Sequence, residues 1–304
     1  MVASRITSAG KTMRLVSQST LERPIALSGV GLHSGAPCRV TLRPGRADAG
    51  INFYGMSENG EQGVPIAADV AAVCETRLGT CLRGADGRIV RTVEHLLAAI
   101  AIASIDDLSI EIDGPEIPAM DGSAGPFLDA IDQAGRKTLA AARRALKVTA
   151  PIEVRDGERF IRATPDDRRR LDVSIAFAET AIGAGTVSLD LDRPESLRRL
   201  ARARTFCRLS DIEAMSEAGL GRGGSLDNAI VVDGDRILNA EGLRDPDEFV
   251  LHKALDLVGD LALAGAPIIG RIEAMKPGHD LNIRFLRQLA ARAAADARTA
   301  PALS

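Results

Sequence analysis

The stretch LHKALDLVGD, from Leu251 to Asp260, decides the fold. Apolar residues cover nearly every face of a helix built from it and its neighbours, so we expect a helix buried between two layers. His252, Asp256 and Asp260 stand at i, i+4 and i+8 and therefore share one face of this helix. Because burying an unpaired carboxylate costs several kcal/mol, this polar face needs partners.

The ends of the helix carry recognisable signals. Asp245 is a good N-cap, Pro246 suits the first helical position, and Glu248 completes a capping-box spacing. Gly265, followed by Pro267, is typical of a helix end. We therefore expect the helix to begin at Pro246 and to end before Gly265.

Two interpretations of the polar face stay open at this point. Buried polar side chains are usually satisfied by hydrogen bonds, or the face could lie against solvent. Alternatively, His252 and Asp256 bind a metal ion, because residues at i and i+4 point the same way, as in the H-E-x-x-H motif. A catalytic zinc would need a third protein ligand and an open position for water.

The other histidines are His33, His95 and His279. His95 lies in TVEHLL, where Thr92 can cap a helix and Glu94 falls in the first turn, a position that favours an anion. A glutamate beside a ligand histidine is well placed to act as a general base. His279 lies in KPGHDLN, a turn that opens a helix and can direct a side chain into a site. A structural histidine at 95 and a surface turn at 279 are the alternatives.

Composition excludes several classes of protein. With 304 residues, 45% hydrophobic and 26% charged, the chain is typical of soluble globular proteins. A net charge of -3 argues against broad nucleic-acid binding, and we expect the basic runs at 166–172 and 197–204 to face solvent. No apolar run approaches the ~20 residues of a membrane span, and no secretory signal is evident at the N-terminus, so we expect a cytoplasmic protein. Four scattered cysteines predict free thiols.

The rest of the chain alternates strand and helix signals. Strands followed by helices in each half predict an α+β protein in which helices cover sheets. The expected elements are strands at 37–44, 108–113 and 171–177, helices at 93–105 and 125–137, hairpins at Asp156-Gly157 and Asp233-Gly234, and an Ala- and Arg-rich linker near 138–146.

Seven motifs in a fixed order carry a family resemblance. They are GVGLHSG (Gly29–Gly35), RTVEHLLAA (Arg91–Ala99), PEIPAMDGSAGPF (Pro115–Phe127), ARTF (Ala203–Phe206), GGSLDNAIVVD (Gly223–Asp233), DEFVLHKALDLVGDL (Asp247–Leu261) and KPGHDLNI (Lys276–Ile283). From about Leu21 to Leu289 the chain resembles the UDP-3-O-acyl-N-acetylglucosamine deacetylases, zinc-dependent amidohydrolases of lipid A biosynthesis.

The resemblance implies both a fold and a reaction. The fold is a β-α-α-β sandwich of two similarly folded α+β domains, residues 14–140 and 146–304, with helices inside and sheets outside; we expect residues 1–13 to be a flexible leader. The reaction removes the acetyl group from UDP-3-O-(3-hydroxyacyl)-N-acetylglucosamine, giving acetate and a free amine, the committed step of lipid A biosynthesis. We expect a monomer in the cytoplasm of a Gram-negative bacterium. The alternatives are a zinc amidase acting on another N-acyl substrate and a non-catalytic binder of a nucleotide-linked lipid precursor.

The resemblance also implies roles for individual residues. One Zn²⁺, with Fe²⁺ suited to the same ligands, would be bound by His95, His252 and Asp256. The catalytic residues would be Glu94 as general base, His279 as the cation that stabilises the oxyanion or protonates the leaving amine, Asp260 as the carboxylate that orients it, and Thr205 as the hydroxyl that hydrogen-bonds the reacting carbonyl.

Substrate contacts follow from the same resemblance. Lys253 would lie near the diphosphate, and Phe177 and Lys276 at the uracil end. The passage for the acyl chain would be lined by Leu32, Phe206, Leu209, Ile212, Leu226 and Val231. The resemblance also suggests that His33 and Cys81 lie near the site, although a small buried thiol is the simpler explanation of Cys81. Departures at Cys207, Arg208, Leu209 and Leu226 leave the acyl-chain length open.

Overall fold

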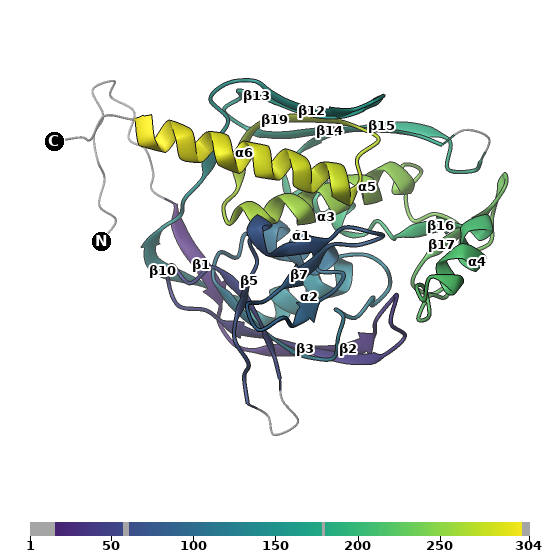
Figure 1. The fold of residues 1–304 in the computed structure, drawn as a ribbon, viewed down its shortest axis with the longest axis horizontal. Helices are drawn as coiled ribbons and strands as arrows, with labels where there is room; N and C mark the ends of the chain where they lie inside the picture. The colour runs from purple at the N-terminus through teal and green to yellow at the C-terminus, as the bar shows by residue number, and fades with distance from the viewer. Residues whose placement is uncertain (1–15, 57–60, 178–179, 300–304) are drawn as a thin grey trace.

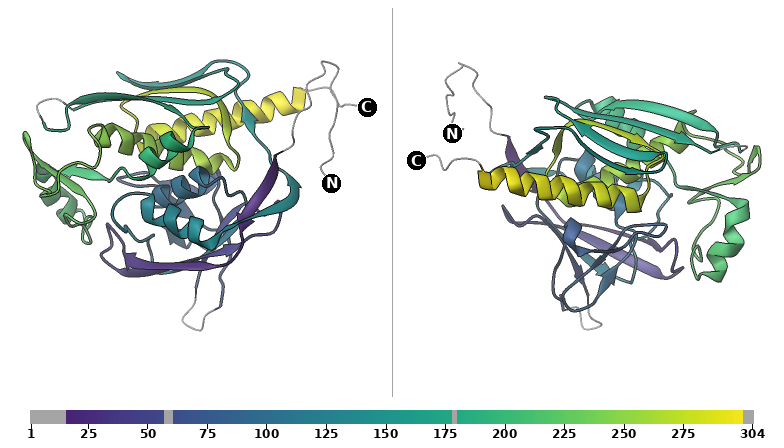
Figure 2. Two further views of the ribbon diagram at one scale, coloured as in Figure 1. Left: turned by 180° about the vertical axis from the view of Figure 1, so that it is seen from behind. Right: turned by 45° about the horizontal axis from the view of Figure 1, so that its top comes forward.

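A computed structural model describes residues 16–56, 61–177 and 180–299. In it, two sheet-and-helix layers face each other with their helices inside and their sheets outside (Figure 1). The reverse view shows the same arrangement, with the inner helices enclosed between the two sheets (Figure 2). The expected α+β sandwich of two similarly folded halves is therefore confirmed, while the bounds 14–140 and 146–304 for separate domains stay a prediction.

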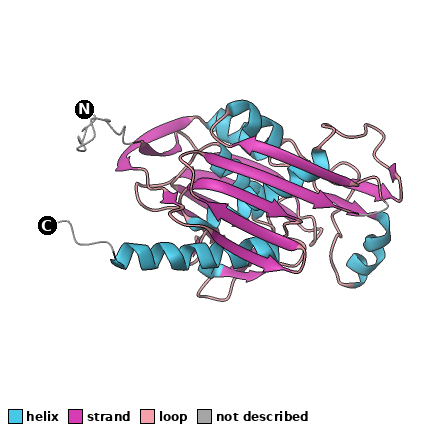
Figure 3. Ribbon diagram, turned by 90° about the horizontal axis from the view of Figure 1, so that it is seen from above, coloured by secondary structure: helices cyan, strands magenta, loops and turns pink. Residues whose placement is uncertain are grey.

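The two outer sheets share one topology. Each consists of five strands that pair in a row, and the pairs are antiparallel except for the one between the third and fourth strands of the row, which is parallel. Each half therefore repeats the same fold. The first sheet runs β2 (Ile25–Val30), β3 (Pro37–Pro44), β9 (Leu108–Asp113), β4 (Ile51–Gly55), β5 (Ile66–Ala67). The second runs β12 (Ile152–Asp156), β13 (Arg159–Thr164), β19 (Ile268–Met275), β14 (Arg169–Ala176), β15 (Ala184–Asp190), with β11 (Leu146–Lys147) beside β19. Figure 3 shows a sheet lying over the helices.

The inner layers are formed by helices that pack across the interface. Their bounds are α1 (Glu94–Ile102), α2 (Gly125–Ala134), α3 (Pro194–Ala201), α5 (Glu248–Leu261) and α6 (His279–Thr299). The helix α5, which contains the opening stretch, packs against α1 of the other half and is buried at every position except Lys253 and Val258. The apolar sequence of α5 is therefore explained by contact with α1, α3 and α6 inside the sandwich.

Each half also carries a small insertion near the ends of α1 and α5. The first consists of η1 (Val70–Ala72), β6 (Val73–Glu75), β7 (Cys81–Arg83) and β8 (Ile89–Val90). The second consists of β16 (Phe206–Arg208), α4 (Leu209–Glu217), β17 (Ile230–Asp233) and β18 (Arg236–Ile237).

Several local expectations are confirmed. Strands form at 37–44 and 108–113, and Gly157 and Gly234 form the two expected hairpin turns with positive φ. All four cysteines are free thiols. In the part of the chain that the structure describes, no helix is long and apolar enough to cross a membrane.

Other local expectations are wrong. Most of the expected linker at 138–146 belongs to β10 (Arg136–Ala142), which pairs antiparallel with β1 (Ser17–Leu21). The helix α5 begins at Glu248 rather than Pro246, and its N-cap is Asp247, without a side-chain cap. Thr92 does not cap α1 either, because its hydroxyl donates to the buried carboxylate of Glu116 at 2.8 Å. The expected leader lies outside the described residues.

Candidate metal centre and active site

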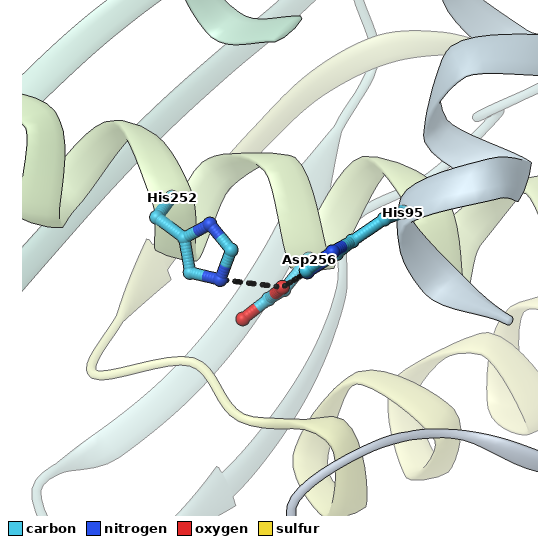
Figure 4. A group of neighbouring side chains, drawn as sticks. All are labelled: His95, His252 and Asp256. Atoms are coloured by element: carbon cyan, nitrogen blue, oxygen red, sulfur yellow. Dashed lines mark ion pairs between the residues drawn. The ribbon is translucent and has the colours of Figure 1, made fainter. Parts of the chain in front are cut away.

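Two helices from different halves bring His95, His252 and Asp256 together (Figure 4). The Oδ1 atom of Asp256 lies 3.3 Å from Nε2 of His252 and 3.5 Å from Nε2 of His95. His95 comes from α1, whereas the other two lie one turn apart on α5. Within the described residues this is the one group of three or more His, Cys, Asp or Glu side chains whose ligand atoms converge, here within 4.8 Å.

The protonation states of this group suit a metal ion. Burial lowers the pKa of His252 to about 3, so its imidazole is neutral. Its Nδ1 lies 3.0 Å from the carbonyl oxygen of Ala203, an interaction that fixes the Nδ1–H tautomer and leaves the Nε2 lone pair free. Burial opposes ionisation of Asp256, but His252 and Lys253 hold its pKa well below the usual range. Two imidazoles and one carboxylate form a donor set that fits Zn²⁺ or Fe²⁺.

Glu94 and His279 face each other beside the metal group. The Nε2 atom of His279 lies 3.9 Å from Oε1 of Glu94. Burial raises the pKa of Glu94 above its ordinary value. Burial alone would lower the pKa of His279, but the charge of Asp260 and its 2.8 Å hydrogen bond to Nδ1 raise it to about 10. The arrangement therefore combines a buried carboxylate with an imidazolium, which suits general base and general acid roles.

Thr205 lies in the same small cavity as His95, together with Thr92 and Leu32. Its backbone is held on both sides, since its N–H donates to Gly122 at 2.8 Å and its carbonyl accepts from the N–H of Ile230. Thr205 thus lines a cavity together with His95, and the role of its hydroxyl stays a prediction.

Lys253, Phe206 and Phe177 also gather at this end of α5. The Lys253 ammonium donates to Asp256 at 2.5 Å and lies 5.6 Å from the centre of the Phe206 ring. That ring contacts the rings of Phe177 and His252, at centroid distances of 5.8 and 6.0 Å. Three of the expected substrate contacts are therefore neighbours.

Lys276 differs from these three. Its ammonium pairs with the exposed carboxylate of Glu158 at 2.9 Å, so the structure gives it a partner on the surface of the second half. Its backbone N–H donates to Ser174 of β14. An approach of Lys276 to a ligand would require it to leave Glu158.

The expected acyl passage is divided between exposed and buried positions. Leu209, Ile212 and Leu226 belong to the second insertion and are 43%, 39% and 45% exposed, whereas Val231 is buried. Leu32 is half-buried and adjoins the same insertion, because its carbonyl accepts from the N–H of Gly223. The structure thus places Leu32 of the first half against the second insertion, and the acyl passage stays a prediction.

Three other residues with expected surroundings lie outside the converging group. His33 does not reach the metal group; its Nε2 donates to the carbonyl of Leu78 and its Nδ1 accepts from Gly221, so it joins the two insertions. Cys81 is a buried free thiol beside Arg91, as the simpler explanation expects, and it is not part of the converging group. Arg204, expected to face solvent, is 1% exposed and binds Glu248.

Thr80 and Asn282 are contacts that sequence reasoning missed. Both are fully buried and both donate to the Asp260 carboxylate, at 2.6 and 2.8 Å. A single threonine in a loop carries no recognisable signal. Asn282 does lie in the KPGHDLNI motif, three residues after His279 on α6, so helical spacing could have placed it on the side of His279 that faces Asp260.

Comparisons with known proteins identify the relatives of this chain. Residues 18–291 match the family described as LpxC: UDP-3-O-acyl N-acetylglycosamine deacetylase. Proteins named UDP-3-O-acyl-N-acetylglucosamine deacetylase from Phenylobacterium zucineum and Anaeromyxobacter dehalogenans are each 46% identical to this chain, over 90% and 92% of it and 94% and 89% of their own lengths. A protein of the same name from Idiomarina loihiensis is 42% identical over 92% of both chains. The chain belongs to the UDP-3-O-acyl N-acetylglycosamine deacetylase family.

Proposed function

We propose that this chain carries out the reaction of its family with one metal ion bound by His95, His252 and Asp256. It would hydrolyse the N-acetyl group of UDP-3-O-(3-hydroxyacyl)-N-acetylglucosamine in lipid A biosynthesis. The observation that carries the proposal is the placement of Glu94 and His279 3.9 Å apart beside the converging ligands. A mere binding protein would not need such a pair of proton-transfer groups.

When bound by these three residues, the metal ion, Zn²⁺ by family resemblance, would supply Lewis acidity toward the acetyl carbonyl and toward water. Its ligands come from helices that are packed on both sides, so their geometry is fixed before substrate arrives. The Ala203 carbonyl accepts a hydrogen bond from Nδ1 of His252 and so orients Nε2 of that imidazole toward the metal position.

Glu94 and His279 would carry out the proton transfers. Ionised Glu94 takes a proton from the attacking water, whose oxygen forms a bond to the acetyl carbon. The hydroxyl of Thr205 donates to the oxyanion that develops. When the C–N bond breaks, the Nε2–H of His279 gives its proton to the amine, and Asp260 stabilises the imidazolium until then. Acetate and the free amine result.

Substrate recognition uses the groups around Phe206. The Lys253 ammonium offers a positive charge to the diphosphate. Phe177 and Lys276 would contact the uracil end, Lys276 after leaving Glu158. The acyl chain would lie against Leu32, Phe206 and the exposed leucine and isoleucine side chains of the second insertion. The cytoplasmic location and the monomeric state stay predictions.

Metal content and acetate release from the UDP substrate, measured on the same sample, test the proposal. We expect one metal ion per chain and release of acetate. Asp256→Asn should lose the metal ion, whereas His33→Gln, which alters a histidine outside the converging group, should keep it. Unchanged substrate after long incubation with metal-loaded protein would favour a binding protein. Turnover of simple N-acetyl sugars would favour a broader amidase.

A further inference from the structure

Thr80, the residue before β7, uses each of its polar groups on the proposed catalytic residues or their immediate neighbours. Its N–H donates to Oε2 of Glu94 at 2.9 Å. Its carbonyl accepts from the N–H of Val93, the residue that precedes Glu94, at 3.1 Å. Its hydroxyl donates to Oδ1 of Asp260 at 2.6 Å and lies 3.3 Å from Nδ1 of His279. Thr80 is 0% exposed, so bulk solvent does not reach these contacts.

These contacts join groups that come from three separate helices. Glu94 begins α1, Asp260 lies near the end of α5 and His279 begins α6. Among the described residues, the N–H of Thr80 is the one hydrogen-bond donor to the Glu94 carboxylate. Asp260 in turn accepts from Thr80, His279 and Asn282. Thr80 therefore contacts one proton-transfer group, Glu94, directly and the other, His279, through the Asp260 carboxylate that binds it.

We propose that Thr80 is a positioning residue that fixes the position of Glu94 relative to the Asp260–His279 pair. This inference rests on the proposed function, because it matters only if protons pass through Glu94 and His279. The proton that Glu94 accepts and the proton that His279 gives belong to one substrate centre. A carboxylate or imidazole displaced by even 1 Å would reduce the rate sharply. Thr80 itself does not contact the substrate.

The side chain of Thr80 can be tested separately from its backbone. Thr80→Val has nearly the same shape and keeps the N–H to Glu94, but it leaves Oδ1 of Asp260 without its hydroxyl donor. Thr80→Ser keeps the hydroxyl and loses only a methyl group. A difference between these two variants therefore reports the hydrogen bond to Asp260 rather than packing.

Steady-state kinetics on metal-loaded protein provide the test. We expect Thr80→Val to lower kcat by about 10- to 100-fold, which is typical when a hydrogen-bond partner of a catalytic group is removed. KM and metal content should stay close to wild type. Thr80→Ser should keep most of the wild-type kcat. If Thr80→Val does not fold, Thr80→Ala is used with the same expectation. The control is Thr20→Val, since Thr20 is also buried and donates to the Asp107 carbonyl at 2.7 Å, away from the site; it should lower stability and leave kcat unchanged.

A double-mutant cycle with Asp260→Asn distinguishes positioning from general destabilisation. If Thr80 acts through Asp260, adding Thr80→Val to Asp260→Asn should lower kcat little further. Wild-type kcat in Thr80→Val, or effects of the two changes that multiply, would overturn the inference. An inactive wild type would instead contradict the proposed function, so the two failures are distinguishable.

Discussion

Glu94 and His279 are each the first residue of a helix, and their side chains approach to 3.9 Å between Oε1 and Nε2. The positive end of a helix dipole favours a carboxylate but disfavours an imidazolium. The charge of Asp260, 2.8 Å from Nδ1 of His279, offsets this effect for the histidine. A base and an acid can therefore lie side by side at two helix starts, because the Asp260 carboxylate compensates the charge of the His279 imidazolium.

This arrangement predicts a bell-shaped dependence of kcat/KM on pH. Burial raises the pKa of Glu94 above 4.5, so activity should disappear as the pH falls through that raised value and the carboxylate is protonated. Asp260 raises the pKa of His279 to about 10, against burial, so the acid is present at neutral pH and should be lost as the pH rises toward 10. Asp260→Asn should move the alkaline limb to lower pH. An alkaline limb that this variant leaves in place would argue against His279 as the acid.

Gly259 allows α1 and α5 to approach closely. A methyl group on Gly259 would collide with the backbone carbonyl oxygen of Glu94. Helix propensity alone predicts that Gly259→Ala stabilises the protein by about 1 kcal/mol. We expect the opposite: a loss of about 1–3 kcal/mol from overpacking, together with a lower kcat because Glu94 shifts.

Urea unfolding and steady-state kinetics check this prediction. Gly265→Ala is the comparison, because Gly265 has φ of +69° but open space around its Cβ position. It should lower the free energy of unfolding through backbone strain of about 1–2 kcal/mol and leave kcat near wild type. Stabilisation by Gly259→Ala would show that the two helices can separate without cost.

Arg204 and Glu248 form a buried ion pair that anchors the ARTF segment to the start of α5. Their side chains are 1% and 0% exposed, and Nε of Arg204 lies 2.9 Å from the carboxylate. Arg204→Met should lower the free energy of unfolding by about 3–5 kcal/mol, because it leaves the carboxylate buried without its cation. Arg199→Gln, which breaks an exposed pair with Asp245 beside the same helix start, should cost at most about 1 kcal/mol. Equal losses in the two variants, measured by urea unfolding, would contradict this account.

Local patterns predicted the elements well where the determining contacts are local. The helical spacing of the apolar residues in α5 and the Asp-Gly turn signals at 156 and 233 can be read from nearby residues, and these predictions are confirmed. The converging His95, His252 and Asp256 were predicted by combining helical spacing with the family resemblance. The roles of the individual residues stay predictions.

The errors arose where a distant partner competes with a local signal. Glu248 has capping-box spacing, but its carboxylate binds Arg204 instead. Thr92 precedes an apolar helix, but its hydroxyl donates to Glu116. Arg204 lies in a basic run, and nothing in that run indicates a buried carboxylate across the fold. Thr80 was missed for the same reason, because its partners lie on three helices.

The central claim is that Glu94 is the base beside a metal ion that it does not bind. The most direct measurement compares acetate release and metal content of the wild type and Glu94→Gln, each as purified and metal-loaded. The account predicts one metal ion per chain in both proteins and a turnover at least about 100-fold lower in the variant. Wild-type turnover in Glu94→Gln, or loss of the metal ion together with activity, would contradict it.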